Sequence, residues 1–461
     1  MFSNLLLCFS FLATVPQITR AAQVANFNVS AETALEYGCD ATCYEYFSYG
    51  LEYDASYFGS LYDEDFYATA DNFSTSEPGD LLKFQPIDPD NLSDIPDGTT
   101  AYRFQYVSVD VFGNSVPATG FIAFPYSSRS NDHKFGTVAW AHGTSGVFRG
   151  CAPSAMPNLY EYGSWAYLIN RGYAVVATDY AGLGNNYTAH QYFAFSAQAN
   201  DLYYSVVAAR QLFGSQLSDE WVSVGHSQGG GAVWTLAESD LLREDPANAG
   251  TYLGTVAQAP GLRGKDLAEE GYYAALNSTG TDNSRAVLGE LGWGAFGLHR
   301  VIANESFSWV HEKFRKRLAL AELAQACYLS MELLVADLEV DDVFNISDAS
   351  FQAEFSVAQN YSLVGQGKSE QPVLVVQGLA DVSVYPDITE LSYEGACEYG
   401  NVIQMQYYPG LDHVPVIAAS APSFLQWIDD RFAGKTTPCS CTNTTIQPFD
   451  ATYMYAPADT D

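Results

Sequence analysis

A glycine-rich turn around Ser227 constrains the fold of this chain more than any other feature of its sequence. The turn reads Gly225-His226-Ser227-Gln228-Gly229, after an apolar strand pattern at 221–224 and before a helix pattern at 229–242. A strand that passes this sharply into a helix holds the central serine exposed and strained, and its neighbours must be small because the backbones crowd there. The pattern predicts that Ser227 is a nucleophile. The alternative is a glycine-rich turn whose serine caps the helix.

Strands and helices alternate on both sides of this turn. Strands are expected at 135–140, 173–178, 253–257, 373–376 and 402–408, and helices at 197–213 and 416–432. Such alternation favours a mainly parallel sheet with helices on both faces. A hairpin at 101–125, with its turn at Gly113-Asn114, precedes this pattern. Together with the serine turn, the alternation predicts the α/β class and an α/β-hydrolase fold.

The interval 261–370 breaks the alternation, because it is largely helical and has no clear strand. It is interpreted as a helical cap, or lid, inserted between two core strands. The other expected parts are a signal peptide at 1–21, an N-terminal extension packing on the core at 22–100, an α/β-hydrolase core at 101–260 and 371–433, and a polar C-terminal tail at 434–461.

The serine turn predicts its partners in chain order, because an acid and then a histidine follow the nucleophile in this fold. His413 lies in a turn after the strand expected at 402–408, and Asp381 lies just past the strand expected at 373–376. A carboxylate there would fix the tautomer of the imidazole and stabilise the imidazolium. Asp387 and Asp412 are the rival acids. The expected catalytic residues are therefore Ser227, Asp381 and His413.

An oxyanion that forms at the substrate needs backbone N–H donors. One donor is expected from Gln228, the residue after the nucleophile. The other should follow an earlier strand, where His142-Gly143-Thr144 stands after the strand expected at 135–140. The Thr144 N–H is the first choice, and the Gly143 N–H is the alternative.

Several features indicate export. The apolar stretch 5–15 is too short to span a bilayer and is typical of a signal peptide. Asn-x-Ser/Thr sequons, which accept N-linked glycans on exported proteins, are numerous. They predict glycosylation at Asn28, Asn72, Asn91, Asn186, Asn277, Asn304, Asn345, Asn360 and Asn443. The chain is expected to be secreted and extracellular.

The cysteines of an exported chain are expected to pair. Cys151 follows the oxyanion segment and Cys327 lies in the cap, so that a bond between them would tie the cap across the site. Cys397 could pair with Cys441 or Cys439, and Cys39 with Cys43 would close a small loop. One cysteine of the mature chain remains unpaired. The cysteine spacings do not resemble a zinc site, and no metal or organic cofactor is implied.

The charge of the chain limits its partners. The chain has 20 basic and 54 acidic residues, for a net charge of −34. So acidic a chain repels phosphate backbones and anionic membrane surfaces, which excludes nucleic acid as a partner. The expected partner is a lipid or small ester, with transient contact at a lipid interface. The sequence does not set the oligomeric state.

The motifs along the chain resemble those of the secretory lipase family typified by Candida antarctica lipase A. The resemblance runs from about Pro78 to Phe432 and rests on 78–83, 142–144 with 151–154, 179–184, the serine turn 225–229, Gln377-Gly378 with Asp381, and His413. It implies a cofactor-free lipase or esterase with a helical cap that acts on acyl esters. The cap and the N-terminal extension match the family poorly.

The expected function is a secreted serine ester hydrolase, a lipase or carboxylesterase, that cleaves acyl esters such as triacylglycerols through an acyl-enzyme. Two alternatives stay open. A secreted serine peptidase of the same fold would keep the same triad, since fold and triad do not fix the leaving group. A catalytically silent binding protein of this fold usually loses a triad member, whereas all three are present here.

Overall fold

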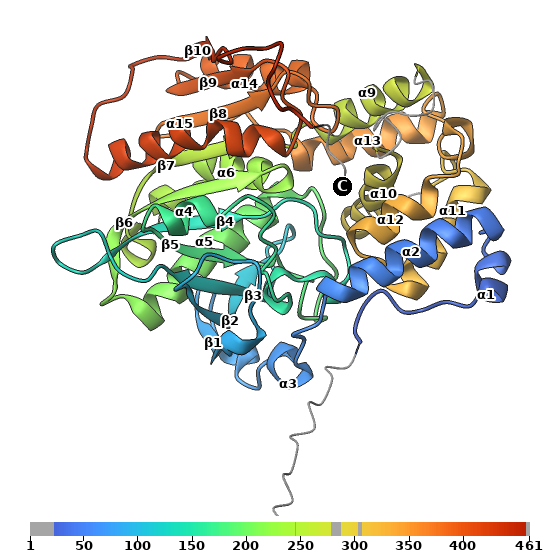
Figure 1. The fold of residues 1–461 in the computed structure, drawn as a ribbon, viewed down its shortest axis with the longest axis horizontal. Helices are drawn as coiled ribbons and strands as arrows, with labels where there is room; N and C mark the ends of the chain where they lie inside the picture. Colours follow the sequence, from blue (N-terminus) through green and yellow to red (C-terminus); the bar gives the residue numbers. More distant parts are fainter. Residues whose placement is uncertain (1–22, 245, 278–286, 303–306, 458–461) are drawn as a thin grey trace, which may run out of the picture.

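A ten-stranded sheet runs through the described part of the chain in the order β1-β2-β3-β5-β4-β6-β7-β8-β9-β10 (Figure 1). The structure, a computed structural model, describes residues 23–457 apart from 245, 278–286 and 303–306. The strands are β1 Leu81–Pro86, β2 Thr100–Val109, β3 Ser115–Phe124, β4 Phe135–Ala141, β5 Ala174–Thr178, β6 Leu217–His226, β7 Thr251–Gln258, β8 Val373–Gly378, β9 Ile403–Tyr408 and β10 Thr442–Thr445.

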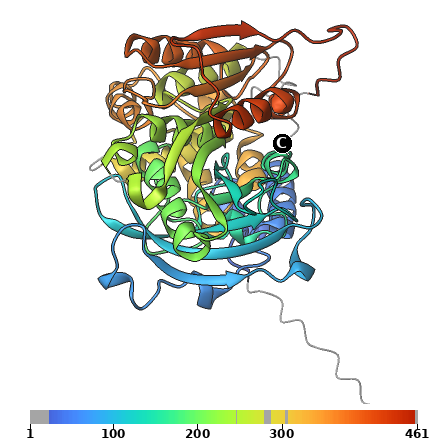
Figure 2. The same cartoon turned by 90° about the vertical axis from the view of Figure 1, so that its left-hand side faces the viewer.

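The pairing divides the sheet into two parts. Strands β1, β2, β3 and β5 pair antiparallel, and all pairs from β5 through β4 to β10 are parallel. The sheet curves from the blue strands at one edge to the red strands at the other (Figure 2). The expected mainly parallel sheet is therefore confirmed, and the hairpin expected at 101–125 forms β2 and β3 within its antiparallel part.

Helices cover both faces of the sheet, because side chains along each strand alternate between the faces. Val373 and Val375 pack with residues of α5 and α6, whereas Leu374 and Val376 pack with residues of α4 and α15. The core helices are α4 Ala166–Asn170, α5 Phe195–Phe213, α6 Gln228–Glu238, α14 Pro386–Glu398 and α15 Pro415–Phe432, with the short α7 Leu241–Glu244 and α8 Pro246–Ala249.

A helical cap stands between β7 and β8, as expected, and lies beside the sheet in Figure 1. It has its own apolar core around Trp309, Phe314 and Phe351. Its helices are α9 Gly264–Asn277, α10 Val287–Val301, α11 Glu312–Ala324, α12 Tyr328–Val335 and α13 Ala349–Ser362.

The N-terminal extension packs on the cap as well as on the core, where Tyr67 bonds to Ser154 and Asp63 pairs with Arg103. Its helices are α1 Ala31–Glu36, α2 Ala41–Tyr57 and α3 Glu64–Tyr67. Helix α2 lies along α12 so closely that a Cβ on Gly50 would stand 2.7 Å from the Cα of Ser330. Asp54 of α2 also accepts hydrogen bonds from the N–H groups of Leu329 (3.2 Å) and Ser330 (2.8 Å). Helix α2 of the extension is thus packed tightly against helix α12 of the cap.

Two expected boundaries also shift. Strand β1 lies inside the expected extension, where it pairs with β2, and strand β10 lies inside the expected tail, where it pairs with β9. Both are edge strands. The sheet therefore begins earlier and ends later than the sequence predicts.

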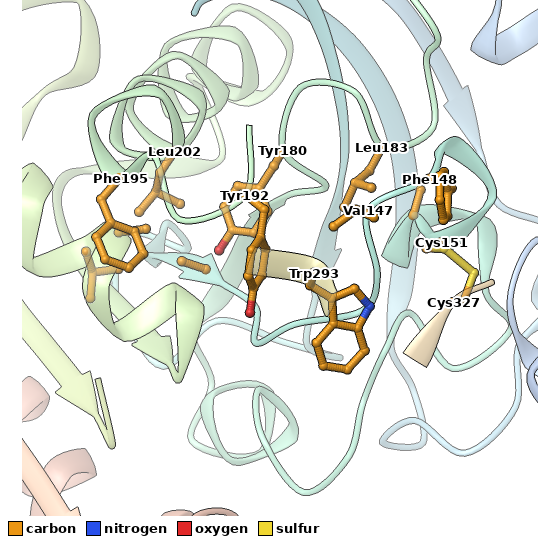
Figure 3. Close-up of a cluster of buried hydrophobic side chains, with 14 of the residues drawn as sticks. Val147, Phe148, Cys151, Tyr180, Leu183, Tyr192, Phe195, Leu202, Trp293 and Cys327 are labelled. Atoms are coloured by element: carbon orange, nitrogen blue, oxygen red, sulfur yellow. A yellow bond between two sulfur atoms is a disulfide. The ribbon is translucent and has the colours of Figure 1, made fainter. Parts of the chain in front are cut away.

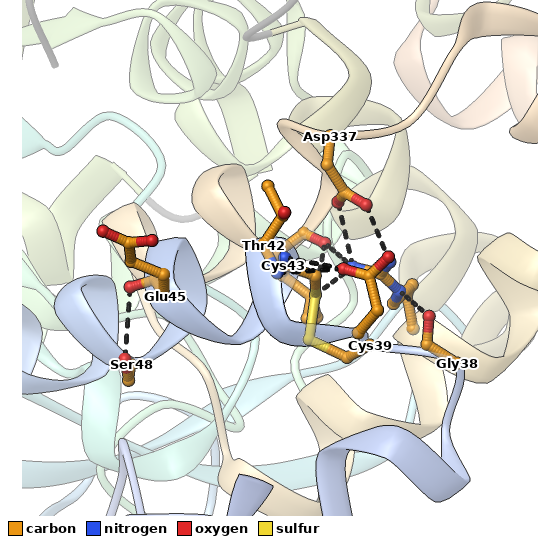
Figure 4. The surroundings of a disulfide bond; sticks show 10 residues. Gly38, Cys39, Thr42, Cys43, Glu45, Ser48 and Asp337 are labelled. Atoms are coloured by element: carbon orange, nitrogen blue, oxygen red, sulfur yellow. Dashed lines mark hydrogen bonds and ion pairs between the residues drawn. A yellow bond between two sulfur atoms is a disulfide. The ribbon is translucent and has the colours of Figure 1, made fainter.

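Three disulfides are present, Cys39–Cys43, Cys151–Cys327 and Cys397–Cys441, and Cys439 is an exposed free thiol. The second joins the core to the cap beside Phe148 (Figure 3). The first lies beside the half-buried Asp337 (Figure 4). Asp337 accepts from both terminal nitrogens of the buried Arg317, at 3.1 and 3.0 Å, while Nε of Arg317 donates to Gly38 O. Arg317 therefore also ties the extension to the cap.

Eight of the nine sequon asparagines lie in the described residues, and all eight are exposed. Asn304 and the expected signal peptide lie outside the described residues. Between residues 23 and 457, with the gaps given above, no helix combines the length and apolar character needed to cross a bilayer.

Candidate active site

Ser227 occupies the sharp turn between β6 and α6. Its backbone has φ 56° and ψ −122°, a conformation that costs a non-glycine residue energy and persists only when the surroundings impose it. The neighbouring glycines explain how the turn fits. A Cβ on Gly229 would lie 1.9 Å from the carbonyl oxygen of Ala141, and a Cβ on Gly225 would lie 2.3 Å from that of Gly229. The motif therefore presents Ser227 at the carboxyl end of the parallel sheet.

His413 and Asp381 meet at the same edge, because each follows a neighbouring parallel strand. The Nδ1–H of His413 donates to Oδ2 of Asp381 at 2.8 Å, and both side chains are buried. The carboxylate is fixed from its other side, since Oδ1 accepts the N–H groups of Ser383 (3.0 Å) and Val384 (2.7 Å). The other ring nitrogen of His413, Nε2, is thereby left as the proton acceptor of the ring.

The two rival acids are placed elsewhere. Asp412 accepts the backbone N–H groups of Val382 (3.1 Å) and His413 (2.9 Å) through Oδ1. Asp387 is exposed in the first turn of α14. The geometry therefore selects Asp381 as the partner of the imidazole.

The expected oxyanion donors lie next to Ser227. Gln228 is the first residue of α6, and the first N–H groups of a helix have no partner within it. The Gly143 N–H donates to the hydroxyl of Tyr162 at 3.3 Å. Thr144 lines the same cavity as Ser227, and among the described residues no hydrogen bond of its N–H is found. Of the two alternatives, Thr144 thus has the available amide.

His226, inside the serine motif, has a role that the sequence analysis did not assign. Burial, and then the neighbouring His413, hold the pKa of His226 well below its ordinary value. The neutral ring has one donor and one acceptor. Its Nε2–H donates to His413 O at 3.2 Å, and its Nδ1 accepts from the Tyr162 hydroxyl at 3.1 Å. His226 therefore supports the backbone of His413.

His190 supports the side chain of Gln228 in a similar way. The side-chain Nε2 of Gln228 donates to Nε2 of His190 at 3.1 Å, while Nδ1–H of His190 donates to Ala181 O at 3.2 Å. Burial, assisted by the charge of Arg300, lowers the pKa of His190 to about 3, so the ring is neutral. Arg300 of cap helix α10 donates to His190 O at 2.8 Å and to Val147 O at 3.0 Å. These contacts fasten the cap to the loops around the site.

Asp179, after β5, holds the segment that follows the oxyanion loop. It is buried and accepts from the Ser154 N–H (2.8 Å) and the Thr119 hydroxyl (2.7 Å). Burial raises its pKa to about 6, against the effect of these donors. It faces these structural partners, and its role is to position the loop.

A cavity of about 660 Å³ opens above Ser227 and His413. Its walls come from α2, from the loop 158–162, and from cap helices α10 and α12. Aromatic side chains dominate the lining: Tyr49, Tyr53, Tyr57, Phe58, Tyr160, Tyr162, Trp293 and Tyr328. The charged side chains that line it, apart from the histidines, are carboxylates: Asp54, Asp94, Glu161 and Glu290.

A second, smaller cavity of about 80 Å³ lies in the cap. Its lining is largely apolar and comes from α9, α10 and α13, including Leu291, Leu298 and Phe355, and from the core segment 192–194. Glu290 lines both cavities, so the two are neighbours. In the described part of the chain, no group of three or more His, Cys, Asp or Glu side chains is placed to hold a metal ion.

These features define the class of the fold. A mainly parallel sheet, a serine turn after β6 and a helical cap between β7 and β8 are those of an α/β-hydrolase. No protein-family profile and no curated protein sequence matches the chain.

Solved structures do match it. The chain is similar to Candida antarctica lipase A, at 16% identity and a TM-score of 0.65, over 86% of this chain and 90% of that one. The closed state of the same lipase matches at 17% identity and a TM-score of 0.63, over 82% and 88% of the two chains. The rice cell wall degrading esterase LipA from Xanthomonas oryzae matches at 15% identity and a TM-score of 0.59, over 78% of this chain and all of that one. The resemblance expected from the motifs is thus confirmed at the level of the fold.

Proposed function

We propose that this protein is a secreted serine ester hydrolase in which Ser227 is the nucleophile, His413 the general base and Asp381 the acid. The observation that carries the proposal is the 2.8 Å hydrogen bond between His413 and Asp381, at the same cavity that Ser227 lines in its strained turn. The names of the matched structures, a lipase and an esterase, support the same reaction class.

The reaction would proceed by two acyl transfers. Ser227 Oγ attacks the ester carbonyl while His413 Nε2 takes its proton, and the oxyanion accepts from the N–H groups of Gln228 and Thr144. The imidazolium then gives its proton to the departing alcohol, which leaves an acyl-serine. Water attacks this ester with His413 again as base, the acid is released, and Ser227 regains its proton.

The substrate is proposed to be an acyl ester, with triacylglycerols among those to be assayed. The apolar cavity in the cap supports an acyl chain as one part of the substrate, since ligand sites are mostly apolar with a few placed polar groups. We also propose that the protein is exported and that the exposed sequons are glycosylated. We expect the cap at 261–370 to bound the site while the core carries the triad.

The peptidase alternative is tested alongside. The carboxylates of the large cavity could hold the ammonium group of a peptide, so a peptide anilide belongs in the same assay. We expect the glycosylated protein to hydrolyse p-nitrophenyl butyrate with a burst of one p-nitrophenol per chain, and Ser227→Ala to abolish both burst and turnover. Turnover of the anilide without ester hydrolysis would favour the peptidase, and neither activity would favour the binding protein.

A further inference from the structure

The aromatic rings of the large cavity form a nearly continuous series from the surface to the serine turn. Along one face of α2, the ring centroids of Tyr49 and Tyr53 are 6.4 Å apart and those of Tyr53 and Tyr57 are 5.4 Å apart. In the loop 158–162, Tyr160 and Tyr162 are 5.0 Å apart, and Tyr162 lies 5.7 Å from His226, the neighbour of Ser227. A substrate in the cavity therefore meets aromatic faces on the way to the nucleophile.

The charges around these rings have one sign. Four carboxylates line the cavity, and no Lys or Arg does so among the residues that the structure describes. Two of the carboxylates are held in place by backbone donors. Asp54 accepts the Ser330 N–H at 2.8 Å, and Glu161 accepts the N–H groups of Ser164 (2.7 Å) and Ala166 (2.8 Å). The net charge of −34 on the whole chain adds a negative potential around the entrance.

We propose that this cavity takes the alcohol part of esters that carry a positive charge there, a quaternary or protonated amine. The inference rests on the proposed ester hydrolysis and names the substrate class of that site. Aromatic faces attract cations, most strongly when the cation is desolvated, and carboxylates around the rings add to the attraction. An anionic ligand would find no Lys or Arg among the described residues of the lining.

A neutral sugar would also stack on tyrosine faces, and the tyrosine hydroxyls of the lining offer it donors as well as acceptors. The difference is one of charge, because the carboxylates of the lining attract a cation and give a neutral sugar no such attraction.

The test compares two esters that differ in one atom, butyrylcholine and 3,3-dimethylbutyl butyrate, in which carbon replaces the charged nitrogen. On the full glycosylated protein at low ionic strength, we expect kcat/KM to be higher for the choline ester by about ten-fold or more. The excess should shrink as salt is added, because salt screens the carboxylates. A ratio of one or less, or a higher value for an acylated methyl glucoside than for both, would overturn the proposal.

Variants of residues that line the cavity, with a control on α2, test where the cation binds. Tyr53 is 47% exposed and lines the cavity, whereas Tyr46 is 45% exposed on the same helix and lies outside the cavity lining. We expect Tyr53→Leu and Asp94→Asn to lower the choline-to-neutral ratio several-fold, and Tyr46→Leu to leave it unchanged. Equal effects of Tyr53→Leu and Tyr46→Leu would contradict the assignment.

Binding separates this inference from the proposed function. Tetramethylammonium should quench the tryptophan fluorescence of the Ser227→Ala chain saturably, and tert-butanol should not. Binding without hydrolysis of either ester would overturn the ester hydrolase and leave the cation site standing. Hydrolysis of the neutral ester without tetramethylammonium binding would overturn the cation site and leave the ester hydrolase standing. If neither binding nor hydrolysis is observed, both proposals are overturned.

Discussion

The imidazole of His413 donates to the carboxylate of Asp381 across 32 positions of sequence, at 2.8 Å. Asp412, its neighbour in the chain, faces the backbone of Val382 instead. We expect Asp381→Ala to lower ester hydrolysis by about 10⁴-fold, because the imidazole loses the partner that sets its tautomer. Asp387→Ala and Asp412→Ala should cost far less. Steady-state kinetics on the folded variants would show it, and a greater loss in Asp412→Ala than in Asp381→Ala would contradict the geometry.

His226 supports the backbone of His413, so its removal should disturb catalysis more than binding. We expect His226→Ala to lower kcat by roughly 10²-fold with a small change in KM, since small misplacements of a catalytic group cost about this much. Tyr162→Phe, which removes the donor to His226, should have a weaker effect in the same direction. A rise in KM at constant kcat would show that His226 acts on substrate binding.

The disulfide between Cys151 and Cys327 spans 176 residues, and that between Cys397 and Cys441 spans 44. If the bonds act through the entropy of the unfolded chain, the longer loop should contribute about 5 kcal/mol and the shorter about 1 kcal/mol less. Denaturant unfolding of Cys151→Ser/Cys327→Ser and Cys397→Ser/Cys441→Ser would measure the free energy of unfolding that each disulfide contributes and show which contribution is larger. Cys439→Ser, at the exposed thiol, is the matched control and should leave the free energy of unfolding unchanged.

Three buried carboxylates and the half-buried Glu238 make stability depend on pH. Burial raises the pKa of Asp54 and Asp179 to about 6 and that of Asp201 and Glu238 to about 7. Between the unfolded values near 4 and these folded values, the folded chain binds more protons, so stability falls as pH rises through this window. We expect the melting temperature to be lower at about pH 8 than at about pH 5.

Asp201→Asn tests whether a buried carboxylate causes this decrease of the melting temperature with pH. Asp201 is buried, and its raised pKa is lost in the amide, so the variant should show a shallower decline of melting temperature with pH. Scanning calorimetry across the window provides the measurement. A melting temperature that rises with pH would contradict the sign of the linkage.

The apolar cavity of the cap predicts acyl-chain preference. Each buried methylene contributes about 0.8 kcal/mol, so kcat/KM should rise from acetate to octanoate esters. Gly294 lines this cavity, and a Cβ there would meet no atom within 4 Å. Gly294→Phe should therefore shift the preference to shorter chains, and Gly294→Ala should change it little. An enzyme that prefers acetate and does not hydrolyse emulsified triacylglycerol would be a plain carboxylesterase.

The sequence predicted the parallel sheet and the serine turn because both depend on local patterns. The apolar run at β8 and the glycines beside Ser227 indicate the local conformation through residues that are adjacent in sequence. The edge strand β10 was missed because its sequence lacks such a pattern. Strand β10, Thr442–Thr445, is polar and exposed at all four positions, and it is held by pairing with β9 and by the Cys397–Cys441 bond.

The contacts that the sequence could not supply join distant segments that carry no catalytic motif and no cysteine pair. The spacing of Tyr49, Tyr53 and Tyr57 indicates one helix face, but that this face borders the cavity depends on how α2 lies against α12. The donor–acceptor pairs of His226 and His190 likewise join segments far apart in sequence. Their only sequence signal is that His226 lies within the serine motif.

Covalent labelling tests the central claim most directly. The intact protein would be treated with a fluorophosphonate, digested, and mapped by peptide mass spectrometry, with Ser227→Ala as control. The proposed triad predicts one adduct per chain, located on Ser227, with loss of ester hydrolysis in step with labelling and no adduct on the variant. Full ester hydrolysis by a chain whose Ser227 stays unmodified, or an adduct on another residue that abolishes activity, would contradict it.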